Sequence, residues 1–458
     1  MAPSGTQRVR GAEADFLGHP RGLIFLSATE MWERFSFYGM RSLLVLYMVK
    51  YLLLPGRGDV IGLDALRGVL ESIFGPLATQ PFASQIYGLY IGFLYLTPLI
   101  GGWLADRVLG QRRTVILGAV LMAVGHFMMA FERLFLLALL TLILGNGALK
   151  PNISTQVGGL YAPSDQRRDR GYSIFYVGIN VGAFFAPLVC GTLGEELGWH
   201  YGFTAAGVGM TIALAVYLYA LPTLPPDEMH KAQAAGVETK PLDRNEWRAI
   251  GTLVVLFLPT TFFWATYEQQ GNTIVLWADG HTDRVIDLMV WRGEIPVTWF
   301  LAFNPLMIFA LTPVIIKFWA WQQRHGMEPS SVSKMALGCF GVAISYLIMA
   351  GAAWSAANES ATWLWLLGYF VAITIGELYL SPIALSLVSK IAPARIMSMM
   401  MGLWFCTSFI GNFGAGWLGS FWSSMDKMSF FIMIASVAGC AGVVTWSFNR
   451  TLRTVLRG

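Results

Sequence analysis

Residues 22–52 decide the class of fold, and they read GLIFLSATEMWERFSFYGMRSLLVLYMVKYL. The stretch is long enough to cross a bilayer, because a hydrocarbon core about 30 Å thick takes roughly 20 residues of α-helix. It nevertheless holds Glu30, Glu33, Arg34 and Arg41. Charged side chains are costly at membrane depth, so they usually face a cavity or a partner. The stretch therefore predicts a transmembrane helix that lines a functional interior.

The composition of the whole chain agrees with a membrane protein. Of the 458 residues, 55% are hydrophobic and 13% are charged, whereas soluble domains carry about 25% charged residues. This composition excludes a soluble globular domain, a disordered chain and a disulfide scaffold. The net charge of +4 is spread over short loops, so we expect no nucleic-acid partner. The four cysteines lie in apolar runs without metal-ligand spacing, so we expect neither a disulfide nor a metal site.

Twelve stretches are apolar and long enough to span a bilayer, which predicts an all-α membrane protein. They are 22–52, 83–105, 113–131, 134–160, 171–195, 199–222, 248–277, 295–321, 333–354, 362–390, 398–420 and 428–450. Loops on the side of the termini hold 20 Lys and Arg residues and the opposite loops hold 6. This bias predicts that both termini are cytoplasmic.

The longest cytoplasmic connection, residues 223–247, divides the predicted helices into six plus six. We therefore expect an N-terminal bundle over 1–222, a linker over 223–247 and a C-terminal bundle over 248–458. Two bundles joined by a central linker are typical of transporters whose binding site lies between the halves. Residues 61–75 of an outer loop predict a short amphipathic helix at the membrane interface.

Charged residues also occur within other predicted spans, among them Lys150, Glu268 and Glu377. One interpretation is that these charges pair only to hold helices together. The other is that they bind a substrate or a proton, which is the default for ionisable residues within a membrane. Helical spacing puts Glu30 and Arg34 on one stripe with the other charges of the first span, and this clustering favours the functional interpretation.

Several motifs resemble those of the proton-coupled oligopeptide transporter family, within the major facilitator superfamily. EMWERFSFYG resembles the family pattern ExxERFxYYG, and GNGALKPNIST resembles GxGxxKPNxS. FYVGINVG resembles FYxxINxG, and FWATYEQQGNT and GELYLSPIALSLVSKIAP are similar to the seventh and tenth spans of the family. These motifs occupy residues 30–39, 145–155, 175–182, 263–273 and 376–393.

The resemblance implies import of di- and tripeptides, driven by protons and achieved by alternating access. A short peptide is a zwitterion, so Arg34 and Lys150 could hold its carboxylate while Glu377 holds its ammonium. Arg41 and Glu268 would form a proton-sensitive gate, and Lys150 would alternate between the span 1 glutamates and the substrate. The implied proton-coupling and gating residues are Glu30, Glu33, Arg34, Arg41, Lys150 and Glu268. The implied peptide-binding residues are Arg34, Tyr38, Tyr95, Lys150, Asn152, Asn180, Trp264, Asn304, Glu377, Ser381, Trp404 and Phe405.

Three departures from the family pattern affect these expectations. Phe37 stands where the family has the first tyrosine of YYG, so one hydroxyl is lost. Gly88 stands where the mammalian branch has a histidine, so that histidine has no role in proton handling here. The chain also has no room for the two extra central spans of many bacterial relatives.

Ser381 precedes Pro382 in the tenth predicted span, and a proline inside a helix makes that point a candidate for flexing.

Other functions remain open at this stage. The same fold could carry nitrate or an organic anion, although Glu377 would repel a bare anion. A membrane peptide sensor is a more remote alternative. An enzyme is not expected, because no HExxH motif or nucleophile elbow occurs. We expect a multi-pass protein of the bacterial inner membrane that works as a monomer, without a cofactor, with protons as the coupling ion.

Overall fold

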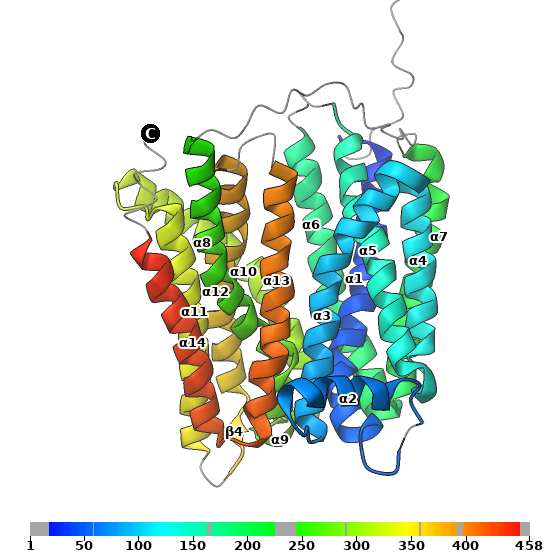
Figure 1. Ribbon diagram of the computed structural model, residues 1–458, viewed down its shortest axis with the longest axis vertical. Coiled ribbons are helices and arrows are strands. Elements are labelled where there is room, and N and C mark those ends of the chain that lie inside the picture. Colours follow the sequence, from blue (N-terminus) through cyan, green and yellow to red (C-terminus); the bar gives the residue numbers. More distant parts are fainter. Residues whose placement is uncertain are drawn as a thin grey trace, which may run out of the picture.

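Long helices that run in similar directions build the molecule, and a short helix lies across one end of them (Figure 1). The computed structural model describes residues 18–57, 59–162, 165, 167–224, 244–288, 291–356, 359–391 and 397–448. Helix α1 begins and helix α14 ends at the same end of the molecule. We call this the terminal end, and the opposite end, where α2 lies, the distal end.

The first half of the chain contributes one group of long helices. They are α1 (Arg21–Tyr47), α3 (Thr79–Leu104), α4 (Gln111–Met128), α5 (Phe135–Gly159), α6 (Arg167–Ala186) and α7 (Trp199–Ala220). Short helical segments adjoin them: η1 (Met48–Leu52), η2 (Ala105–Leu109), η3 (Glu132–Leu134), η4 (Pro187–Gly191), η5 (Leu193–Leu197) and η6 (Leu221–Thr223). Helix α1 packs against α6 and α7, and α4 packs against α5.

The second half contributes the other group. Its long helices are α8 (Arg244–Tyr267), α10 (Phe303–Arg324), α11 (Ser331–Ser355), α12 (Leu364–Ile391), α13 (Met397–Gly419) and α14 (Lys427–Ser447). The shorter segments are η7 (Glu268–Gly271), α9 (Thr273–Gly280), η8 (Val297–Ala302) and η10 (Ser420–Ser423). Helix α11 packs against α12 and α14, and α8 packs against α13.

Membrane-length apolar helices are abundant in the part of the chain that the structure describes. By length and composition, nine helical segments there could cross a membrane. Helices α1, α4 and α13 run alongside them in Figure 1. All the predicted spans coincide with helices, with boundaries shifted by a few residues. The structure thus confirms a mostly helical fold with several membrane-length helices.

The predicted interfacial helix is α2, Leu63–Phe74. It lies across the distal end (Figure 1). Val69 and Ile73 expose 59% and 65% of their surface, as a helix with an apolar face towards lipid would.

Two small sheets at the distal end were not predicted from the sequence. Strands β2 (Val285–Leu288) and β3 (Trp291–Glu294) form an antiparallel pair. Strands β1 (Thr282–Asp283) and β4 (Ala361–Thr362) form a parallel pair of two residues each. Such short strands leave almost no periodic signal in a sequence.

The two halves approach each other closely where α3 meets α13. A Cβ atom on Gly88 would lie 2.7 Å from the carbonyl oxygen of Asn412 and 2.8 Å from the Cα of Gly416. A side chain at position 88 would therefore force the two backbones apart, because real Cβ atoms do not approach other atoms that closely. This contact gives a physical reason for glycine where the mammalian branch of the resembled family has histidine.

Candidate functional site

A cavity of about 340 Å³ lies between the two halves. Helices of both groups line it, which fits the predicted position of a transporter site. The predicted site residues on its wall are Glu30, Arg34, Tyr38, Arg41, Tyr95, Lys150, Asn180, Trp264, Glu268, Asn304, Glu377, Ser381, Trp404 and Phe405. Two predicted residues, Glu33 and Asn152, do not line it.

The charges of α1 form one buried cluster. Arg34 contacts Glu33 through two nitrogens, and its Nε lies 3.3 Å from Glu30 Oε1. The second carboxylate oxygen of Glu30 is buried without a hydrogen-bond partner among the described residues. Glu33 therefore binds Arg34 without lining the cavity itself. Glu30, which does line the cavity, keeps one carboxylate oxygen available as an acceptor.

Lys150 of α5 is placed at the same wall without a counter-ion. Its Nζ lies 5.2 Å from the centre of the Tyr95 ring, and no acidic side chain of the described residues is within 4.0 Å of it. The structure thus pairs the two glutamates of α1 with Arg34 and leaves Lys150 available. The predicted alternation of Lys150 between the glutamates and a substrate remains a prediction.

Asn152 faces away from the cavity. Its Nδ2 donates to the carbonyl oxygen of Ala148 at 2.7 Å and lies 3.3 Å from that of Gly101. The reason is helical geometry, since residues two apart point in directions roughly 200° different. If Lys150 faces the cavity, Asn152 must face the packing between α5 and α3. The structure therefore gives Asn152 a packing position, and its predicted contact with a peptide is not supported.

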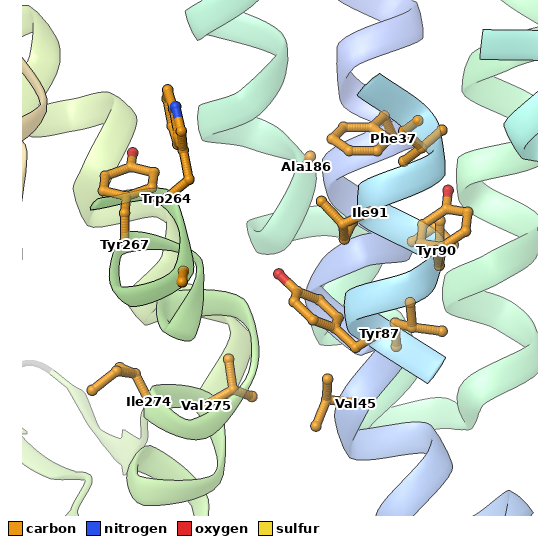
Figure 2. Packing of buried hydrophobic residues seen from close by; sticks show 14 of the residues in the cluster. Phe37, Val45, Tyr87, Tyr90, Ile91, Ala186, Trp264, Tyr267, Ile274 and Val275 are labelled. Atoms are coloured by element: carbon orange, nitrogen blue, oxygen red, sulfur yellow. The ribbon is translucent and has the colours of Figure 1, made fainter. Parts of the chain in front are cut away.

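Arg41 and Glu268 form an ion pair that links α1 to η7. The Glu268 side chain is 2% exposed and that of Arg41 is 11% exposed. The hydroxyl of Tyr87 accepts hydrogen bonds from Arg41 Nε at 3.0 Å and Nη2 at 2.8 Å. In Figure 2, Tyr87 on α3 points across towards the segment that carries Tyr267. The predicted gate pair is thus present as a contact between the halves.

Further polar contacts join the halves towards the distal end. Lys50 Nζ lies 2.8 Å from Asp279 Oδ1, and the hydroxyl of Ser84 donates to Asn272 Oδ1 at 2.8 Å. The structure therefore represents a state in which the distal end is closed.

Glu377 occupies the cavity wall that belongs to the second half. Its Oε2 accepts a hydrogen bond from Asn304 Nδ2 at 3.0 Å, and this amide also lies 3.1 Å from Thr374 Oγ1. No basic side chain of the described residues pairs with Glu377 within 4.0 Å. An acidic group is thus presented opposite the basic groups of α1 and α5.

Aromatic rings complete the wall. Trp264 and Tyr267 lie on successive turns at the end of α8 (Figure 2). The indole nitrogen of Trp264 is buried without a partner among the described residues, so it could donate to a ligand. Ser381 is at the cavity and is followed by Pro382 inside α12.

Several residues of the wall were missed by the sequence analysis. They are Ser42, Tyr176, Ile179, Ala183, Pro187, Tyr267, Gln270, Gly271, Leu301, Pro305, Ile308, Leu385 and Ser408. Six of them lie in the quoted motifs, so a motif signal existed for these, namely Tyr176, Ile179, Tyr267, Gln270, Gly271 and Leu385. The other missed residues are small or aliphatic and resemble ordinary packing residues. The described residues include no group of three or more His, Cys, Asp and Glu that could hold a metal ion.

Comparison with known proteins identifies relatives along almost the whole chain. The model of the POT family matches residues 112–226 and 226–434. The chain is 33% identical to "Peptide transporter YePEPT" of Yersinia enterocolitica, over 88% of each sequence. It is 31% identical to a "Di-/tripeptide transporter" of Lactococcus lactis subsp. cremoris, over 96% of this chain and 97% of the relative.

Solved structures agree with these matches. A crystal structure of a variant of a peptide transporter POT in complex with alafosfalin matches with a TM-score of 0.83 and 29% identity, over 97% of both chains. A POT family transporter in complex with 5-aminolevulinic acid matches with a TM-score of 0.80 and 26% identity, over 95% of this chain and 97% of the other.

Proposed function

Because the chain belongs to the POT family and is a peptide transporter, we propose that it imports di- and tripeptides together with protons by alternating access. A short peptide carries a carboxylate at one end and an ammonium at the other. The transporter must therefore offer both a basic and an acidic contact inside a desolvated cavity.

The observation that carries the proposal is the separation of charge across the cavity. Arg34 and Lys150 come from the first half of the chain, and Glu377 comes from the second. A peptide held at both ends would draw the two halves together, which is how a ligand biases a conformational equilibrium. The same arrangement disfavours nitrate or another bare anion, because Glu377 would repel it.

Protons are proposed to act on Glu268 and on the α1 cluster. When Glu268 takes a proton, Arg41 loses its counter-ion and the contact between α1 and η7 weakens. Glu30 and Glu33 share Arg34, so a proton on one of them would change the charge beside the proposed carboxylate site. No cofactor is required in this scheme.

The membrane topology is also a proposal. We assign twelve transmembrane helices, with cytoplasmic termini, from the bias of 20 to 6 in Lys and Arg. The terminal end would then face the cytoplasm and the closed distal end the outside of the cell membrane. The units would be the bundles 1–222 and 248–458 with the linker 223–247, working as one monomer in a bacterial inner membrane.

Uptake into liposomes tests the function. Purified protein is reconstituted, and uptake of labelled dialanine is followed with and without an inward proton gradient. Unlabelled dialanine, trialanine, free alanine and nitrate serve as competitors, and protein-free liposomes serve as the control. Gradient-dependent uptake that only the two peptides block is expected. Competition by nitrate, or uptake that does not depend on the proton gradient, would contradict the proposal.

A further inference from the structure

The distal end of α6 contains an unusual local structure that the gate pair does not explain. Two π-helical segments, η4 (Pro187–Gly191) and η5 (Leu193–Leu197), follow α6. Single-turn π-helical segments often occur at functional positions. Here they bring the first half of the chain against η8 of the second half, where a Cβ atom on Gly191 would lie only 1.9 Å from Thr298 Oγ1.

The side chain of Glu195 connects these two segments. Its Oε2 accepts a hydrogen bond from the backbone N–H of Val297 at 2.8 Å. Its Oε1 accepts from the backbone N–H of Thr298 at 2.9 Å and from the Thr298 hydroxyl at 2.6 Å. Beside it, the indole N–H of Trp299 donates to Thr192 Oγ1 at 2.7 Å.

Glu195 thereby caps a helix that belongs to the other half. The first N–H groups of a helix have no partner within it, and the residue before η8 is Pro296, which provides no side-chain cap. A carboxylate at a helix N-terminus is also favoured by the helix dipole. If the halves separate at this end, Val297 and Thr298 lose this acceptor.

The contact does not include a cation. The two basic residues near Glu195, Lys50 and Arg284, pair with Asp279 at 2.8 Å and Glu294 at 2.5 Å. Among the described residues no basic group lies within 4.0 Å of the Glu195 carboxylate. This contact therefore differs in kind from the Arg41–Glu268 pair.

We infer that Glu195 is a latch that holds the distal end closed through the N-terminus of η8, independently of the proton-sensitive pair. It is a positioning residue, because it acts on the cavity through the helices that it joins. Pro187, the first residue of η4, and Leu301 of η8 both line the cavity. Opening of the latch would therefore move two parts of the cavity wall apart.

The inference rests on the proposed alternating access but does not depend on the cargo. In Glu195→Gln an amide nitrogen must face one of the donors, so at least one hydrogen bond to a charged acceptor is lost. Such a bond contributes enough to change an equilibrium about tenfold. We expect the ratio of distal-open to distal-closed molecules to rise by about that factor.

A matched control is the adjacent residue. Glu196 is exposed and lies on the same small distal pocket, and its carboxylate accepts no hydrogen bond from the described residues. Glu196→Gln makes the same change of charge one residue away, and we expect no shift in the equilibrium.

The experiment measures the opening directly. Spin labels are placed at Leu197→Cys and Val285→Cys, one on each half, where the native side chains expose 63% and 52% of their surface. Cys406 and Cys440 are replaced by serine, because they are not buried and would react with the label. The other two cysteines are buried and are kept. Double electron–electron resonance then gives the distance distribution in liposomes, without any peptide present.

Glu195→Gln should increase the long-distance population about tenfold relative to Glu196→Gln and the parent. Thr298→Val, which removes one donor and keeps the fold of η8, should give a smaller shift in the same direction. If Glu195→Gln does not give a monodisperse protein, Thr298→Val is the variant that tests the latch. Identical distributions in all variants would overturn the latch.

A transport measurement separates this result from the proposed function. If the distal end faces outward, more molecules are ready to bind outside peptide, so the half-saturating concentration should fall while the maximal rate does not rise. A distance shift without any peptide uptake in the parent would keep the latch and refute the proposed cargo.

Discussion

Replacement of Glu268 by glutamine is expected to abolish proton-driven peptide uptake and to leave peptide counterflow largely intact. Counterflow exchanges labelled for unlabelled peptide and needs no net movement of protons. Glutamine mimics the protonated carboxyl group in size and in its ability to accept a hydrogen bond. It cannot, however, release or take up a proton.

The structure sets the size of the effect on the closed state. Glu268 contacts Arg41 with both side chains almost fully buried, so screening by water is weak. A hydrogen bond to a charged group contributes about 1.5–3 kcal/mol, which corresponds to about 10- to 150-fold in an equilibrium. Arg41 keeps the hydroxyl of Tyr87 as an acceptor, so we expect a value near the lower limit. The closed distal end would thus be weakened but still populated.

The assay compares two activities of the same liposome preparation, namely uptake driven by an inward proton gradient and counterflow of labelled dialanine. Tyr87→Phe is the matched control, because it removes a neutral partner of Arg41 and keeps the ion pair. It should retain gradient-driven uptake. Equal loss of both activities in Glu268→Gln would refute the assignment of proton coupling to Glu268, because the residue would then be required for peptide movement itself.

Three further predictions concern single side chains. Lys150→Gln should lose both gradient-driven uptake and counterflow, since it removes the unpaired cation proposed to hold the peptide carboxylate; wild-type counterflow in this variant would contradict that role. Glu377→Gln should weaken competition by dialanine about 10- to 150-fold, the range for a charged hydrogen bond, and should leave competition by N-acetyl-dialanine unchanged because that peptide has no ammonium. Equal weakening of both competitors would exclude the ammonium contact. Asp426 accepts a hydrogen bond from the backbone N–H of Ser429 at 2.9 Å at the start of α14, and hydrogen bonding with Ser429 lowers the pKa of the Asp426 carboxyl. Its contribution to stability is therefore present above the ordinary pKa of aspartate and is lost as the pH falls through the lowered value. Asp426→Ala should lower the melting temperature at pH 7 and have less effect at acidic pH, as measured by thermal unfolding of the purified protein; an equal decrease at both pH values would argue against the cap.

The long helices and most of the cavity were predictable because both leave periodic or compositional signals. An apolar run of about 20 residues predicts a span wherever it occurs. Ionisable residues within such runs are so costly that Glu30, Lys150 and Glu377 could be assigned to a shared interior before any contact was known. The structure places all three on one cavity.

Predictions were less accurate for the direction in which a side chain points than for the position of its residue within a membrane span. Asn152 lies in the same motif as Lys150, but two residues of helix rotate it away from the cavity. Pairing within the α1 cluster was equally open. Arg34 is one residue from Glu33 and four from Glu30, and spacing alone did not show that it would engage both and leave Lys150 unpaired.

The least predictable features are those that act only between the two halves. Glu195 and Glu196 are chemically identical neighbours in LGEELGW, and periodicity gives no reason to separate them. The difference arises because the π-helical segments direct one carboxylate to a helix N-terminus about a hundred residues further along the chain and leave the other exposed. A transporter must break such contacts in every cycle, so contacts between the halves must be strong enough to close one end and weak enough to reopen. The Glu195 contact consists only of backbone and hydroxyl donors around one carboxylate, so it can form and break without a change in protonation. The Arg41–Glu268 pair would then be the contact that responds to protons.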